Sequence, residues 1–224
     1  SAYTMNGSLF NGMGQGDVLL TTLQMANATA AIVNKGWYFT PHIVKAIDGK
    51  PNPDPRFKVK HKTLVDPKHF GPIIKGMEAV VTSGTARSLK SNEFTMLAKT
   101  GTAQVPQGKD NSIFVLAAPA ENPKIVIAAV MEHAGFGATW AGPAATAIAE
   151  KYLTGDLKRE NLYKKLVGAS FMPEYKRQWV VELKRKGLYK EPNKDSIKIE
   201  GIEDSLKFIK NEEIRARLIL KRDS

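Results

Sequence analysis

The sequence predicts an α/β (α+β) fold, in which part of an antiparallel sheet is flanked by helices and followed by a helical carboxy-terminal extension. Three strand-like segments lie between residues 95 and 131 and are joined by short, turn-rich links. Apolar residues recur at helical spacing before and after these segments. After Gly155 the composition shifts toward Lys, Arg and Glu, with fewer aliphatic residues.

The first helix is expected over residues 21–35, where apolar side chains recur every three or four positions. Thr21 or Thr22 suits the N-cap, because a threonine hydroxyl can accept a hydrogen bond from a free helical N–H. Gly36 suits the position just after the helix. The segment therefore predicts an amphipathic helix that could lie on the sheet.

A second helix is expected to begin at Asp66-Pro67, which suit the N-cap and the first turn, and to end near residue 83. Between the two helices, residues 37–39 and 43–47 indicate short strands. Prolines at three alternate positions then indicate a surface loop or hairpin; they are Pro51, Pro53 and Pro55.

The sheet is predicted from residues 95–103, 112–118 and 125–131. Links this short favour an antiparallel meander, because parallel strands need long crossovers. The third segment is continuously apolar, so both of its faces should be covered. Residues 140–153 form an alanine-rich helix that could lie close to the sheet, and further helices are expected near 157–167, 174–186 and 204–219.

Composition limits the classes of function. The chain has no cysteine, which excludes disulfides and thiolate metal sites, and its four histidines lack zinc-site spacing. We therefore predict no metal and no cofactor. The net charge of +11 is concentrated after residue 156 and favours a solvated lysine-rich surface, so no nucleic-acid partner is predicted. The composition change suggests two domains, residues 1–155 and 156–224.

The clearest chemical motif is Lys99-Thr100-Gly101-Thr102 on the first strand of the meander. Thr100 and Thr102 are two positions apart and share one face of a strand. A lysine ammonium and two hydroxyls can together bind a carboxylate. Gly101 leaves room for another element to approach closely. A main-chain N–H at a strand edge can form half of an oxyanion hole. The tripeptide alone also fits a solvated lysine.

The segments around the Lys-Thr-Gly motif indicate a protein family more specifically than the motif alone. In order and spacing, they resemble the class B penicillin-binding proteins of the penicillin-binding protein 2 type, which are elongation-associated peptidoglycan D,D-transpeptidases. Lys-Thr-Gly is one of the signatures of these proteins and of serine β-lactamases. The resemblance covers residues 12–155 and is carried by Gly14-Gln15-Gly16-Asp17, Gly36-Trp37-Tyr38-Phe39-Thr40-Pro41, Ala98-Lys99-Thr100-Gly101-Thr102-Ala103-Gln104, Ala118-Pro119-Ala120-Glu121-Asn122-Pro123 and Gly135-Phe136-Gly137-Ala138-Thr139-Trp140.

The resemblance implies a serine β-lactamase and transpeptidase-like fold and a serine acyl-enzyme mechanism. Lys99, Thr100, Gly101 and Thr102 would bind the substrate, and the N–H of Thr102 would belong to the oxyanion hole. It also implies peptidoglycan stem peptides and β-lactam antibiotics as ligands, and elongation-machinery membrane proteins as partners through an amino-terminal part. The expected location is the periplasmic face of the bacterial cytoplasmic membrane, with the anchor outside this chain.

Two motifs of the resembled family are missing from the chain. No serine is followed by lysine three positions later, and none is followed by asparagine two positions later. Ser-x-x-Lys supplies the nucleophile of this family and Ser-x-Asn a catalytic loop. We therefore expect a truncated domain that is inactive by itself, because its nucleophile lies upstream. The apolar surface left exposed by truncation predicts self-association of the isolated chain.

Two alternatives remain at this stage. A β-lactam-hydrolysing or β-lactam-sensing relative would also use Lys-Thr-Gly, and its deacylation rate would distinguish it from a transpeptidase. A non-catalytic binding module could instead use the basic tail to contact a membrane or partner proteins, and its binding would depend on salt.

Overall fold

The computed structural model describes residues 14–15, 18–105, 108–170 and 172–189. The described residues divide into two compact units: the first contains those up to Val105 and from Lys109 to Ala169, and the second contains Gly108 and those from Ser170 onward. Within the described ranges, no helix combines the length and the apolar character needed to cross a membrane. The expected helix over residues 204–219 lies outside the described residues.

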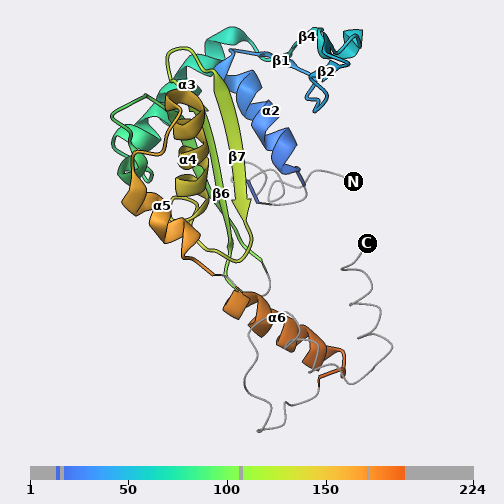
Figure 1. Cartoon of the computed structure of the whole chain (residues 1–224), viewed down its shortest axis with the longest axis vertical. Helices are drawn as coiled ribbons and strands as arrows, with labels where there is room; N and C mark the ends of the chain where they lie inside the picture. Colours follow the sequence, from blue (N-terminus) through green and yellow to red (C-terminus); the bar gives the residue numbers. More distant parts are fainter. Residues whose placement is uncertain (1–13, 16–17, 106–107, 171, 190–224) are drawn as a thin grey trace. The chain divides into compact units, whose positions relative to one another are not determined.

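The first unit is built on a three-stranded antiparallel sheet (Figure 1). Its strands are β5 (Leu97–Ala103), β6 (Asn111–Ala118) and β7 (Ile125–Met131), which lie side by side in that order. The meander expected from the short links is confirmed, and so is the mixed α/β fold. The strand order leaves β5 on the outside of this sheet, which determines where its polar groups point.

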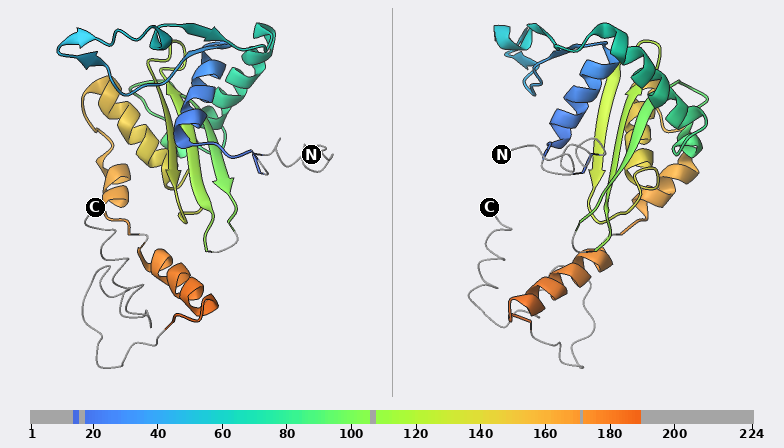
Figure 2. Two further views of the ribbon diagram at one scale, coloured as in Figure 1. Left: turned by 90° about the vertical axis from the view of Figure 1, so that its right-hand side faces the viewer. Right: turned by 180° about the vertical axis from the view of Figure 1, so that it is seen from behind.

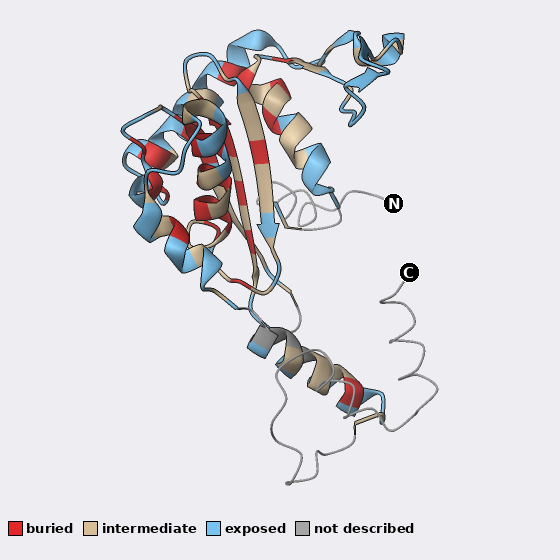
Figure 3. Cartoon of the chain, in the orientation of Figure 1, coloured by how far each residue is buried: buried red, intermediate tan, exposed pale blue. Residues whose placement is uncertain are grey.

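Two helices cover the opposite faces of the sheet (Figure 2). Helix α2 (Thr22–Val33) and helix α4 (Ala141–Thr154) both contact β7, as its continuous apolar sequence predicted. The alternation along β6 separates the two cores: Ala117 packs with Val33, whereas Phe114 packs on the α4 side. Figure 3 shows that buried residues are concentrated where α4 lies on the sheet.

Helix α2 begins with a capping box. The Thr21 hydroxyl accepts a hydrogen bond from Gln24 N (3.2 Å), and Gln24 Oε1 accepts one from Thr21 N (2.8 Å). This arrangement satisfies two main-chain donors that would otherwise have no partner. The prediction of a cap at residue 21 or 22 is confirmed at Thr21. The helix ends at Val33, two residues before the expected limit.

Helix α3 (Phe70–Thr82) begins later than the sequence predicted, because a short 3₁₀ turn, η2 (Pro67–His69), comes first. Asp66 accepts a hydrogen bond from Lys68 N (3.0 Å) and so caps that turn rather than the helix. Phe70, Met77 and Val81 of this helix are buried, whereas Ile73 is 47% exposed. The helix therefore packs on the core through a narrow stripe of its surface.

Between α2 and α3 the chain forms two small antiparallel pairs. Strand β1 (Trp37–Phe39) pairs with β4 (Lys60–Lys62), and β2 (Ala46–Ile47) pairs with β3 (Lys50–Pro51). A 3₁₀ turn, η1 (Pro55–Phe57), lies between β3 and β4 along the chain. Only Ala46 and Ile47 of the expected strand over residues 43–47 are paired, and Ile43 is almost fully exposed. The segment confirms the expected surface hairpin.

The first unit extends beyond the boundary that composition suggested. Residues 156–169, which were assigned to the charged extension, lie within the first unit and contain helix α5 (Glu160–Val167). Helix α5 contacts α4, and its Tyr163 is buried. The average composition of residues 156–169 could not reveal that they belong to the first unit, because only a few of their side chains pack against it.

Those side chains surround Glu150, a fully buried carboxylate on α4. The Tyr163 hydroxyl donates a hydrogen bond to Glu150 Oε2, and Arg159 Nε lies 3.5 Å from Glu150 Oε1. Arg159 Nη1 also donates to Leu89 O (2.7 Å). Burial, together with the hydrogen bond to Glu150, raises the pKa of Tyr163 to about 12. A buried charge is tolerated when it is paired in this way.

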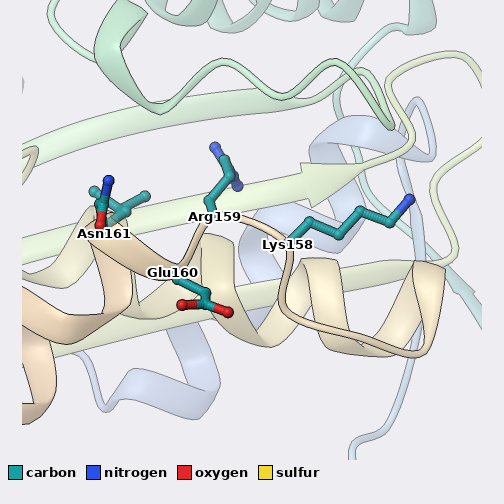
Figure 4. Close-up of a pocket in the computed structure, with 5 residues that line it drawn as sticks. Lys158, Arg159, Glu160 and Asn161 are labelled. Carbon is teal, nitrogen blue, oxygen red and sulfur yellow. The ribbon is translucent and has the colours of Figure 1, made fainter.

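Figure 4 shows the start of α5, where Arg159 and Glu160 point in opposite directions. A hollow of about 470 Å³ is lined here by Lys158, Arg159, Glu160, Asn161 and Leu162. It includes no residue of Lys-Thr-Gly-Thr. Arg159 already pairs with Glu150, so we assign its role to the docking of α5.

The second unit contains helix α6 (Met172–Arg185), close to the expected range of 174–186. Leu183 is its buried centre and packs with three partly buried residues, which are Trp179, Leu188 and Tyr189. Glu182 forms ion pairs with Arg185 and Lys186. Hydrogen bonds from these two cations lower the pKa of Glu182 to about 2. The helix thus carries a small apolar cluster and a strongly charged surface.

Candidate active-site strand

The Lys-Thr-Gly-Thr sequence lies on the outer strand β5, which pairs only with β6 among the described residues. Two side chains reach its carbonyl groups: Lys99 Nζ donates to Thr100 O (2.5 Å), and Gln15 Nε2 donates to Thr102 O (3.3 Å). In an antiparallel strand, the N–H and C=O of one residue point to the same side. The N–H groups of Thr100 and Thr102 therefore face the unpaired edge.

The side chains of the motif divide between the two faces of the sheet. Thr100 lies opposite Phe114 on β6, and Thr102 lies opposite Ser112, so both threonines share the face covered by α4. Lys99 belongs to the other face and is exposed. Its ammonium turns back to the strand edge, where it meets the Thr100 carbonyl.

A tight turn packs on the main chain at Gly101. A Cβ atom on Gly137 would lie 2.6 Å from Gly101 O and would collide with Ile113 O. The fully buried Ser112 fixes this turn, since its hydroxyl donates to Phe136 O (3.0 Å) and accepts from Ala141 N (3.0 Å). Sequence reasoning predicted a close approach at Gly101 but did not identify Gly137 as the residue that makes it.

Replacing Gly137 with alanine is expected to destabilise the chain by about 1–3 kcal/mol, the usual cost of overpacking. The added methyl group must displace either the turn or the Gly101–Ile113 backbone. Urea unfolding measures the change. Gly76→Ala is the matched control, because a Cβ there meets nothing within 4 Å in α3 and alanine favours a helix. Equal stability of Gly137→Ala and the unmodified chain would contradict this packing.

The structure brings one further side chain to the motif. Thr85 follows α3 in the turn over residues 83–86, and its Oγ1 lies 3.0 Å from Thr100 Oγ1. The sequence predicted only a helix-ending turn there. Fifteen positions separate the two threonines, and no spacing rule links a turn after a helix to a strand residue that far along the chain.

These groups together can bind an anion. An exposed ammonium and two outward main-chain N–H groups lie at the outer edge of β5, and two threonine hydroxyls lie beside that edge on the face covered by α4. Such donors form short, charge-assisted hydrogen bonds with a carboxylate. An N–H at the same edge can also stabilise the negative charge that develops on a carbonyl oxygen during acyl transfer.

An antiparallel sheet flanked by helices is also the fold of solved penicillin-binding transpeptidase domains. Residues 3–154 match the family described as the penicillin binding protein transpeptidase domain. The chain belongs to this family. The matched region ends at the last residue of α4 and does not include α5.

Within the family, the similarity is to the penicillin-binding protein 2 (PBP2, MrdA) type. The chain is 33% identical over 175 residues to peptidoglycan D,D-transpeptidase MrdA of Haemophilus influenzae, which covers 68% of this chain and 26% of that protein. Pseudomonas aeruginosa PBP2, solved in complex with WCK 5153, matches with a TM-score of 0.60 and 34% identity over 71% of this chain and 36% of that one.

A third relative is Helicobacter pylori PBP2, solved in a complex with MreC. It matches with a TM-score of 0.56 and 27% identity, over 69% of this chain and 28% of that one. The chain spans about a quarter of the length of the H. influenzae relative. What the whole relatives bind or catalyse therefore enters only as a proposal for this protein.

Proposed function

We propose that this chain supplies the substrate-binding strand of a peptidoglycan D,D-transpeptidase, which cross-links cell-wall stem peptides through a serine acyl-enzyme. The observation that carries the proposal is the outer edge of β5, where Lys99 and the outward main-chain groups of Thr100 and Thr102 lie together. A stem peptide ends in a free carboxylate next to the bond that is broken, so it needs both an anion site and an oxyanion donor.

In this proposal, Lys99 provides positive charge near the nucleophile and the substrate carboxylate. Thr100 and Thr102 donate hydrogen bonds to that carboxylate, or to the equivalent group of a β-lactam antibiotic. The N–H of Thr102 binds the carbonyl oxygen as it becomes an oxyanion. A Cβ on Gly101 would meet Ile113 Cβ on the paired strand at 3.1 Å, so glycine avoids a tight contact at this position of the motif.

The reaction proceeds in two acyl transfers. A serine hydroxyl attacks the carbonyl carbon of the penultimate residue and loses its proton to a base, and the terminal D-alanine leaves as the amine. An amine of a neighbouring stem peptide then attacks the serine ester, and the serine leaves with a proton. We propose that this serine and its activating lysine lie in a part of the protein preceding this sequence, and that the chain alone is inactive.

The partners and location follow from the same proposal. The H. pylori relative was solved with MreC, and we propose that this protein likewise meets elongation-machinery membrane proteins, through a part outside this chain. It would act at the periplasmic face of the cytoplasmic membrane. We also propose a transpeptidase portion over residues 1–155 and an extension over 156–224. The family match over residues 3–154 supports the first portion, although the folded unit continues to Ala169.

D-alanine release from a donor pentapeptide tests this function. The full-length protein should release D-alanine and form a cross-linked product when an acceptor peptide is added, and penicillin should block both. The penicillin adduct should be hydrolysed slowly, since the proposed site transfers the acyl group to an amine rather than to water. Rapid, repeated hydrolysis of penicillin without peptide cross-linking would instead identify a β-lactam-hydrolysing enzyme.

A further inference from the structure

Thr85 is held by a rigid turn beside the proposed substrate strand. Ser83 N (3.0 Å) and Gly84 N (2.8 Å) both donate to Ala79 O, and Ala86 N donates to Val80 O (3.0 Å). Ala86, the next residue, is fully buried. The main chain on both sides of Thr85 is therefore fixed to α3, while the Thr85 side chain remains exposed.

The turn itself packs tightly on the helix. A Cβ on Gly84 would lie 2.8 Å from Val80 Cα and 3.0 Å from Ala79 O, so the chain approaches α3 as closely as its backbone allows. This packing determines the position of the next residue. Thr85 Oγ1 consequently meets Thr100 Oγ1 at 3.0 Å, which is hydrogen-bond distance.

The number of protons available determines which threonine donates in the Thr85–Thr100 hydrogen bond when an anion is bound. Each threonine hydroxyl carries one proton and can accept further hydrogen bonds, whereas a carboxylate can only accept. When Thr100 donates its proton to a carboxylate, its oxygen remains free to accept from Thr85. The Thr85 hydroxyl then donates to Thr100, and the two bonds polarise each other in one chain.

We propose that Thr85 is a positioning residue for the substrate carboxylate, acting through Thr100. Its hydroxyl orients the Thr100 hydroxyl so that the Thr100 proton points to the bound anion. This role rests on the proposed function, and it assigns to the turn after α3 a part in recognising the terminal carboxylate of a stem peptide or a penicillin. Thr85 itself does not need to touch the ligand.

The test is the second-order rate constant for acylation of the full-length protein by a fluorescent penicillin. Thr85→Val, which keeps the shape of the side chain but removes the hydroxyl, is expected to lower this rate roughly tenfold, the effect of one lost hydrogen bond. Thr85→Ser should restore it. Thr82→Val is the matched control, because Thr82 is exposed nearby and its hydroxyl bonds Glu78 O within α3.

A double-mutant cycle separates positioning from a merely structural role. In a Thr100→Val background, adding Thr85→Val should cause no further loss, because the path through Thr100 is already broken. The inference is overturned if Thr85→Val reacts as fast as the unmodified protein, or if the loss is equally large in both backgrounds. An unmodified protein that penicillin never acylates would overturn the proposed function itself, and this inference with it.

Discussion

Replacing Arg159 with alanine is expected to destabilise the first unit by about 3–5 kcal/mol, the usual cost of removing one partner from a buried ion pair. Arg159 is the cation next to the fully buried Glu150, and it also donates to Leu89 O. Without it, Glu150 would retain the Tyr163 hydroxyl but lose its compensating charge. Urea or thermal unfolding of the chain measures the loss.

The neighbouring residue provides a matched control. Lys158 forms an ion pair with Glu93 in which the two side chains are 52% and 38% exposed. Such exposed pairs contribute about 0–1 kcal/mol, so Lys158→Ala should unfold almost like the unmodified chain. If the two substitutions destabilised the chain equally, Glu150 would not be the anchor of the segment over residues 156–169.

Replacing Lys99 with alanine is expected to slow acylation of the full-length protein by penicillin on the order of a hundredfold. A hydrogen bond to a charged group contributes about 1.5–3 kcal/mol, and the ammonium is proposed to act on both the substrate carboxylate and the nucleophile. Lys99 is exposed, so its removal should leave the fold intact. Fluorescent penicillin labelling over time provides the rate.

Lys124→Ala is the comparison for this effect. Lys124 is also exposed, and it lies in the link between β6 and β7 rather than on the outer strand. It should label at the rate of the unmodified protein. Equal rates for Lys99→Ala and Lys124→Ala would remove Lys99 from the proposed substrate site, whatever the function of the protein.

Much of the fold could be predicted from the sequence because its determinants are local. The turn-rich links fix an antiparallel sheet, and the alternation on β6 separates the two cores. The helix cap was narrowed to Thr21 or Thr22 because a threonine at the start of the apolar pattern suits that position, and in the structure Thr21 meets Gln24 only three positions along the chain. The Lys-Thr-Gly motif was likewise contained in one strand, which is why its position on β5 could be anticipated.

The features that were missed depend on contacts between distant residues. Arg159 bonds Leu89 across seventy positions, and no composition window detects such a pair. In the sequence, Gly137 indicates only a turn. Its close contact with the main chain of Gly101 becomes evident in the folded structure. Thr85 becomes part of the site only because α3 ends beside β5. Each case is set by tertiary packing, which overrides what the local sequence indicates.

The proposed function requires that this chain holds the substrate-binding strand of an acyl-transfer site and that the nucleophile comes from outside the chain. Intact-mass analysis after incubation with penicillin tests both requirements, with the full-length protein and the 224-residue chain treated side by side. We predict one stable penicillin adduct on the full-length protein and none on the isolated chain. An adduct on any serine of the isolated chain, or none on a folded full-length protein, would contradict the claim.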